Sequence, residues 1–245
     1  MSFLIFSRSP KLSMLRWVLP ALLSAIAALL ACFPLSWAAG WVLPENIKTL
    51  APDLTLHGTI WQGTASGLPL FEAANVKVDP KSRQIYFQSG GEGNYFAGQA
   101  SQSEAKNIDF RMNFATVPFT DGRLQGLRGH FNISISEMKL SGQSCKSATG
   151  TAKSDVLQRN GGTIQWTGPA LAGPIRCEDG ALIADLSGQD AQQKISALIR
   201  ILPQGTYRAD IDVRTARSEA GLVLPLFGFS RSGQSFVLTE QGKWR

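Results

Sequence analysis

The chain has 245 residues and a formal charge of +6, from 24 Lys and Arg against 18 Asp and Glu. Its 24 glycines and 12 prolines favour many turns over long helices. Arg8, Lys11 and Arg16 lie near the N-terminus and the other basic residues are scattered singly, so the sequence lacks the basic cluster of a nucleic-acid-binding protein.

The N-terminal segment predicts a membrane anchor. No Asp, Glu, Lys or Arg occurs between Trp17 and Pro44, and a helix needs about 20 mostly apolar residues to span a bilayer. Because the basic residues precede this run, we expect a cytoplasmic tail over 1–16, a transmembrane helix over 17–39 and a periplasmic domain over 40–245. The predicted location is therefore the bacterial inner membrane, crossed once.

Basic and aromatic residues flank this span as expected for membrane interfaces, namely Arg16, Trp17, Trp37 and Trp41. A cleaved signal peptide is the alternative, because Ser36-Trp37-Ala38 fits a small-x-small cleavage site. The apolar run is longer than a usual signal-peptide core, which favours a retained anchor. Both interpretations export the rest of the chain.

Apolar and polar residues alternate repeatedly along the exported part, which predicts antiparallel strands with one dry face and one solvated face. After Ile135 the alternation changes phase, which predicts a bulge or turn near Ser136 and Glu137. We expect a mainly β domain of nine or ten strands, built as a curved sheet or a sandwich, with strands at 54–60, 76–78, 84–88, 108–114, 131–135, 163–166, 182–186, 207–214 and 235–239.

Helical patterns are few and short. Residues 44–50 could form a turn, and 190–201 have helical spacing, although 195–201 could also be a strand. A short helix interrupted by Pro225 is expected within 218–227. The polar, glycine-rich stretch 89–106 is expected to be a loop or a long hairpin.

Two segments about a hundred residues apart resemble each other. The sequence GTIWQG at 58–63 is echoed by GTIQWTG at 162–168, so the domain could consist of two similar halves, 44–142 and 150–245. Coincidence in a Gly- and Thr-rich β protein explains the echo equally well. Trp61 and Trp166 occupy related places in the two segments, and packing in the core or at a sheet edge is the expected role.

The exported part contains two cysteines, Cys145 and Cys177, which are expected to form a disulfide in an oxidising compartment. Neither belongs to a CxxC motif, and no histidine lies near them. The third cysteine, Cys32, falls within the predicted span and is interpreted as a small apolar residue.

No catalytic constellation is recognisable. The sequence has neither a GxSxG elbow nor an HExxH motif, and its two histidines, His57 and His130, lie on or beside predicted strands. A hydrolase would need one of them beside a Ser or Asp in a cleft. Asp210 and Asp212 alternate with arginines, which indicates ion pairs on a strand surface. We expect no enzymatic activity, no cofactor and no metal site.

Several longer segments resemble a known family. They are LTLHGTIWQGTASGL at 54–68, GGTIQWTGPALAGPIRCEDGALIADL at 161–186, and the closing LPLFGFSRSGQSFVLTEQGKW at 224–244. With the short tail, single anchor and cysteine pair, the chain resembles type II secretion system protein N of the general secretion pathway. The resemblance implies an accessory inner-membrane component of the machine that exports folded proteins, with subunits of the inner-membrane platform or the outer-membrane channel as partners.

A lipid-handling scaffold is the alternative function. A curved sheet with a large apolar concave face can hold acyl chains, as in AsmA-like folds. Two halves packed face to face would close the core and favour protein contacts, whereas a continuous half-pipe would favour lipid. The residues expected to line such a groove are Trp61, Phe110, Phe114, Phe131 and Ile133.

Overall fold

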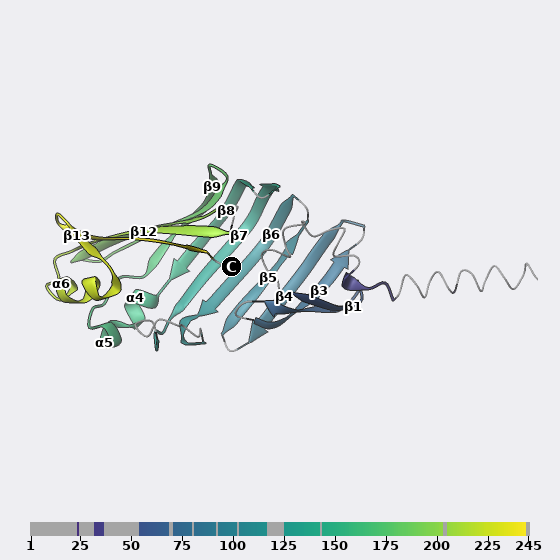
Figure 1. Ribbon diagram of the computed structural model, residues 1–245, viewed down its shortest axis with the longest axis horizontal. Helices are drawn as coiled ribbons and strands as arrows, with labels where there is room; N and C mark the ends of the chain where they lie inside the picture. Colours follow the sequence, from purple (N-terminus) through teal and green to yellow (C-terminus); the bar gives the residue numbers. More distant parts are fainter. Residues whose placement is uncertain are drawn as a thin grey trace, which may run out of the picture.

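The computed structural model describes residues 24, 32–36, 54–68, 71–79, 81–91, 93–101, 103–116, 125–142, 144–202 and 205–243 (Figure 1). The predicted tail over 1–16, most of the predicted span over 17–39, the turn at 44–50, and Arg16, Trp17, Trp37 and Trp41 lie outside these residues. Within the described part, no helix has the length and apolar character needed to cross a membrane.

The described residues form one antiparallel sheet of 14 strands. Strands β1 to β12 lie side by side in chain order, and β14 then lies between β12 and the edge strand β13. The strands are β1 Thr55–Gly58, β2 Gly63–Leu68, β3 Phe71–Asp79, β4 Gln84–Gly91, β5 Asn94–Ala100, β6 Glu104–Asn113, β7 His130–Ser141, β8 Ser144–Ser154, β9 Leu171–Glu178, β10 Ala181–Gln189, β11 Gln193–Ile201, β12 Thr206–Thr215, β13 Ser230–Ser232 and β14 Ser235–Lys243.

This architecture confirms the prediction of a mainly β, antiparallel fold with few short helices. The sheet is open and strongly curved along its length: Figure 1 shows β3 to β7 face-on, whereas β12 and β13 are seen edge-on. The predicted phase change is confirmed, because the β7–β8 register shifts between Ile135 and Glu137. The strand alternative for 195–201 is also confirmed, by β11.

Of the two structures expected for 89–106, the loop is wrong and the hairpin is confirmed, because β4 and β5 pair as antiparallel strands from the pair of Gly91 with Asn94 to the pair of Ile85 with Ala100. Residues 89–106 form the end of β4, all of β5 and the start of β6. These strands are difficult to recognise from the sequence, because Gly90, Gly91 and Gly98 break the alternation that marks a strand. A Cβ at position 98 would lie 2.4 Å from Ile108 Cδ1 and 2.9 Å from Phe87 Cζ, so these side chains would have to shift to admit one.

The strand predicted at 163–166 is wrong as well. The segment contains the end of α5, Gly161–Ile164, which follows α4, Val156–Arg159. Four alternating residues also fit a single helical turn, and here that turn places Ile164 and the buried Trp166 against the core. The similar segment at 58–63 instead contains the β1–β2 turn, in which the Thr59 N–H donates to the Gln62 carbonyl at 3.0 Å. The two similar sequences therefore adopt different structures.

The remaining helical segments are short. The expected helix within 218–227 is present as α6, Ala220–Val223, followed by the 3₁₀ turn η3, Leu224–Phe227, which contains Pro225. A further 3₁₀ turn, η1, covers Phe114–Thr116 after β6. Ala220, Val223 and Leu224 pack on the sheet, so this helical segment covers part of its apolar face at the β12–β14 end.

Two separate hydrophobic clusters form on the sheet. The larger one joins β7 to β14 with α6, η3 and Trp166, around the buried side chains of Ile175, Leu186 and Ile195. The smaller one lies on β2 to β4 around Val76, Val78 and Ile85. The two ends of the sheet thus have their own cores and do not pack against each other as the two layers of a sandwich would.

The predicted disulfide between Cys145 and Cys177 is present, with the two Cα atoms 5.5 Å apart. It ties the start of β8 to the end of β9, beyond the last backbone pair of these strands, Gly150 with Ile175. Closing a loop with a sequence separation of 32 residues stabilises the fold by about 3–4 kcal/mol in the chain-entropy model.

Opposite charges form the predicted ladder on the polar face. Asp210 pairs with Arg208 at 2.9 Å on its own strand and with Arg200 at 3.3 Å on β11. Asp212 pairs with Arg214 at 3.4 Å. These partly exposed ion pairs each contribute little stability.

The smaller cluster includes a residue from the N-terminal segment. Leu35 is 1 % exposed and packs with Ile60, Ala65 and Val76. The neighbouring backbone is fixed as well, because the Ile60 N–H donates to the Phe33 carbonyl at 3.0 Å and Pro34 bridges to Thr59. Residues 33–35 fall inside the span predicted from hydropathy, and here they contact the β sheet.

Replacing Leu35 tests this contact. Leu35→Ala is expected to lower the free energy of unfolding by about 2–5 kcal/mol, because it opens a cavity in the smaller cluster. Leu222→Ala is the control, since Leu222 is 78 % exposed and its truncation should change stability by less than about 0.5 kcal/mol. Denaturant titration of the full chain in detergent measures both, and equal effects would contradict the packing of Leu35.

Candidate functional site

The apolar face of the sheet is the candidate site, because neighbouring strands place apolar residues opposite one another across it. Phe110 on β6 lies opposite Ile133 on β7, and Met112 lies opposite Phe131. Ile133 in turn lies opposite Ala152 on β8. Three of the predicted groove residues, Phe110, Phe131 and Ile133, therefore share one face of two adjacent strands.

An aromatic strip crosses the middle of this face, formed by Phe87 on β4, Phe96 on β5 and Phe110 on β6. The rings of Phe87 and Phe96 stack with centroids 4.6 Å apart. Those of Phe96 and Phe110 meet edge-to-face at 6.4 Å. Phe87 lies opposite Gly98, so the strip depends on a position with no side chain.

Phe87 and Phe96 were not predicted as groove residues, and Phe96 lies in the stretch 89–106, for which a loop or a long hairpin was expected. The signal was nonetheless present, since Phe87 lies in a predicted strand and Phe96 precedes the small residues Ala97 and Gly98. That Gly98 lies opposite Phe87 can be recognised only when the register of β4 and β5 is known.

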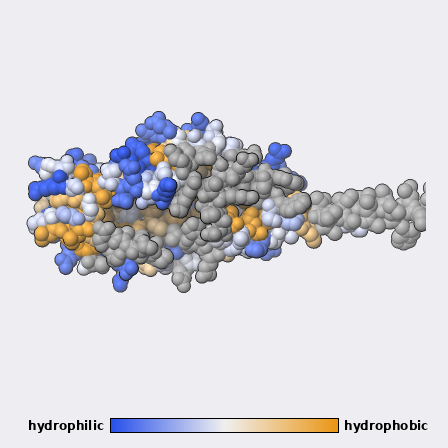
Figure 2. Space-filling view, in the orientation of Figure 1, coloured by the Kyte–Doolittle hydropathy of each residue, from blue (hydrophilic) through white to orange (hydrophobic). Residues whose placement is uncertain are grey.

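The strip lies between the two hydrophobic clusters and belongs to neither. Its three rings are partly exposed, whereas residues at the centres of the clusters are buried. Figure 2 shows a hollow with an apolar floor on the side of the molecule where β12 to β14 lie. The strip itself is an apolar surface whose three rings are not fully buried.

Two predicted groove residues lie elsewhere. Trp61 is 48 % exposed in the turn between β1 and β2, four strands away from β6 in the sheet order. Phe114 lies in η1, after the end of β6, and its N–H donates to the Gly129 carbonyl at 2.9 Å. The structure therefore does not bring Trp61 together with Phe110, Phe131 and Ile133.

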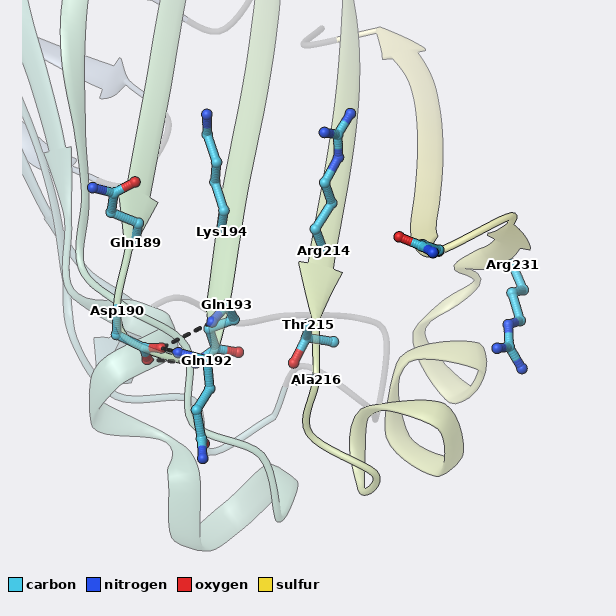
Figure 3. Close-up of a pocket in the computed structure, with 10 residues that line it drawn as sticks. Gln189, Asp190, Gln192, Gln193, Lys194, Arg214, Thr215, Ala216 and Arg231 are labelled. Carbon is cyan, nitrogen blue, oxygen red and sulfur yellow. Dashed lines mark hydrogen bonds between the residues drawn. The ribbon is translucent and has the colours of Figure 1, made fainter.

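A second concave region is a polar pocket of about 540 Å³ at the ends of β10, β11 and β12 (Figure 3). Lys194 and Arg214 extend in parallel from adjacent strands, whereas the Arg231 side chain points away from them. The pocket is lined by Gln189, Asp190, Gln192, Gln193, Lys194, Arg214, Thr215, Ala216, Arg231 and Gln234.

The carboxylate in this pocket has a structural role. Asp190 Oδ1 accepts hydrogen bonds from the N–H groups of Gln192 at 2.8 Å and Gln193 at 3.0 Å. Its Oδ2 accepts one from the Gln193 side chain at 2.8 Å. The Gln193 side-chain hydrogen bond, then the N–H groups and the charge of Arg217, lower the pKa of Asp190 below its usual 3.8. Asp190 thus closes the β10–β11 turn.

The histidines lie outside these two regions. His57 is exposed on β1, and His130 begins β7 with its Nδ1 3.9 Å from Asp155 Oδ2. Asp155 also accepts a hydrogen bond from the His130 N–H at 2.6 Å, which holds α4 against the start of β7. In the described part of the chain, no three His, Cys, Asp or Glu residues are grouped as metal ligands.

Comparison with protein families assigns the chain to a family. The model of the family described as type II secretion system (T2SS), protein N matches residues 73–238, which is more than half of the chain. The chain belongs to the type II secretion system protein N family. Comparisons with curated proteins and with solved structures gave no significant match.

The match to protein N covers the parts of the fold described above as functional candidates. It begins within β3 and ends within β14, so it includes the aromatic strip, the disulfide and the polar pocket. The contact of Leu35 with the β1–β2 turn lies before it. The recognition made from the sequence segments is therefore confirmed at the level of the family.

Asp190 gives a prediction for how the stability of this protein depends on pH. Its pKa is lowered by folding, so its contribution is complete above the unfolded value of about 4 and is lost as the pH falls through the lower folded value. Asp190→Asn is expected to lower the melting temperature at pH 7, with a difference from wild type that shrinks below about pH 4. Thermal melts between about pH 2.5 and 7 measure this. A difference that stayed constant over the whole range would show that the charge is unimportant.

Proposed function

We propose that this protein is an inner-membrane accessory component of the type II secretion apparatus, which helps to export folded proteins from the periplasm across the outer membrane. The observation that carries the proposal is the protein N match over residues 73–238. Its action is through protein–protein contacts with other secretion subunits of the inner-membrane platform or outer-membrane channel. It has no enzymatic activity in this proposal.

The proposed topology is a single N-terminal span with the β sheet in the periplasm. Arg8, Lys11 and Arg16 precede the apolar run, which supports a cytoplasmic N-terminus. The buried Leu35 supports a retained anchor, because cleavage after Ala38 would remove a core residue of the sheet. The disulfide between Cys145 and Cys177 supports an oxidising compartment.

The sheet is suited to holding partners at the membrane surface. Its charged face carries paired charges, and its apolar face is long and only partly covered. Such a module offers a surface on which other proteins can bind. His130 and Asp155, in contrast, join the start of β7 to α4. Attachment to the membrane would raise its local concentration near other inner-membrane subunits.

The proposal is tested in the native membrane of the producing bacterium. Deleting the gene is expected to lower the amount of secreted substrate proteins in the medium and to leave them in the periplasm. Chemical crosslinking of the full-length protein should yield adducts that contain known type II secretion subunits. Normal secretion after deletion, together with crosslinks to unrelated proteins alone, would contradict the proposed function.

Binding of acyl chains is a second candidate function. The observation that favours it is the partly exposed strip of Phe87, Phe96 and Phe110 on an open sheet. A closed sandwich would have buried these rings, and the two separate clusters leave them between two covered regions. An apolar surface of this kind, on a protein held at a membrane, offers a place for lipid chains to leave water.

A photoactivatable phospholipid in phosphatidylethanolamine and phosphatidylglycerol vesicles tests this candidate. Phe96→Gln in the full-length protein should reduce crosslinking about tenfold, because burial of one aromatic side chain stabilises a complex by about 1.5–3 kcal/mol. Leu222→Gln is the matched control, since it also replaces an exposed apolar residue but lies on α6. Equal crosslinking of wild type and Phe96→Gln would exclude the strip as the lipid site.

A further inference from the structure

The N-terminal segment is held on the sheet at the turn between β1 and β2. The Ile60 N–H donates to the Phe33 carbonyl at 3.0 Å, and Leu35 is buried beside Ile60. Leu35 also lies close to the backbone of β2, since a Cβ on Gly63 would be only 2.4 Å from Leu35 Cδ2. This attachment fixes the point at which the N-terminal apolar run meets the sheet.

The attachment limits the length of the proposed membrane span. Only 16 residues, 17–32, separate Arg16 from the part that is held on the sheet. As an α-helix they would be about 24 Å long at about 1.5 Å per residue, whereas the hydrocarbon core of a bilayer is about 30 Å thick. Because Arg16 keeps the other end at the cytoplasmic interface, a shortfall of about 6 Å draws the attached end of the sheet to the periplasmic surface of the membrane.

The turn at this attached end carries an aromatic residue of the kind found at membrane interfaces. Trp61 follows Ile60 directly and is 48 % exposed. A Trp side chain combines an apolar ring with a polar indole N–H, and it is enriched at the level of the lipid headgroups for that reason. The exposed ring thus lies in the turn that the short span brings to the membrane.

Two cations lie in the neighbouring turn, between β3 and β4. The Val78 N–H donates to the Ile60 carbonyl at 2.9 Å, so the end of β3 lies beside the β1–β2 turn. Lys81 and Arg83 follow β3 and are exposed. The carboxylate of Asp79 accepts a hydrogen bond from the Lys81 N–H at 2.9 Å and thereby closes this turn. Exposed Lys and Arg side chains suit the phosphate groups of phospholipids.

We propose that the β1–β2 turn, together with Lys81 and Arg83, is a membrane-contact surface that lies in the phospholipid headgroup layer of the periplasmic leaflet. The inference rests on the retained span of the proposed function. Trp61 contacts the boundary between headgroups and acyl chains, and the two cations contact lipid phosphates. The short span selects phospholipid as the occupant, because it holds this turn at the membrane surface whether or not another protein is bound.

This contact fixes which end of the sheet faces the membrane. Figure 1 shows residues 32–36 beside β1, at the opposite end of the sheet from β13. Neighbouring strands lie about 4.8 Å apart, so β13 is about 60 Å from β1 along the curved sheet. The polar pocket at the ends of β10, β11 and β12 is therefore held away from the inner membrane, within the periplasm.

A spin label in the β1–β2 turn tests the contact. Full-length protein with Cys32→Ser and Gln62→Cys is labelled and placed in nanodiscs of phosphatidylethanolamine and phosphatidylglycerol, with Cys145 and Cys177 protected by their disulfide. The label should collide more often with oxygen, which concentrates in the bilayer, than with a water-soluble nickel chelate. Leu222→Cys in the same background is the matched control, because position 222 is exposed on α6 at the other end of the sheet and should show the reverse order.

Lengthening the span tests the cause of the contact. Four apolar residues inserted after Ser24 would add about 6 Å of helix and should move the label at position 62 into water, with loss of its preference for oxygen. The same four residues inserted after Ser9 are the control, because they precede Arg16 and leave the length of the span unchanged. Thermal melts of each full-length variant in detergent show whether the sheet is folded.

Three results would overturn the inference. They are equal collision with the nickel chelate at positions 62 and 222, an oxygen preference at position 62 that survives the insertion after Ser24, and magnetic coupling between labels at position 62, which would make a second copy the occupant. If the label lies in water while the protein still crosslinks to secretion subunits, the membrane contact is wrong and the proposed function stands. If the label lies at the membrane and no secretion subunit crosslinks, the contact stands and the proposed function fails.

Discussion

The constraint on which the structure depends is that one face of a single sheet is apolar and has no second sheet to cover it. Alternation along each strand separates ion pairs such as Asp210 with Arg200 from apolar residues such as Ile211. Helical segments and Leu35 cover the two ends, and each end forms its own cluster. The middle is left to aromatic side chains, which remain partly exposed.

This arrangement links stability to binding. The buried clusters at both ends stabilise the sheet, and the disulfide secures β8 to β9 where their backbone pairing has ended. The rings of Phe87, Phe96 and Phe110 are partly exposed, and the second half of β14 is paired with a described strand on one side only. They are the regions at which another molecule could add contacts without breaking existing ones.

Much of the fold followed from the sequence. Regular alternation in 108–114 and 207–214 predicted strands that are present as β6 and β12, and the change of phase after Ile135 predicted a real bulge. Prediction left a loop and a hairpin as alternatives where side chains gave no alternation, as in the glycine-rich β5, and it failed where a short pattern fitted two structures, as in α5. In the candidate site, Phe110, Phe131 and Ile133 could be grouped from adjacent strands, whereas Phe87, Phe96 and the position of Trp61 required the register.

The sequence by itself determined the β class, the two faces of the strands, the cysteine pair and the membership in the protein N family, because these depend on local patterns or on residue identity. Only the tertiary structure decided that the strands form one open sheet and that Leu35 belongs to its core. It also decided that β14 extends beyond β13. These features depend on which distant segments pair and where pairing stops, and alternation within a strand contains no information about either.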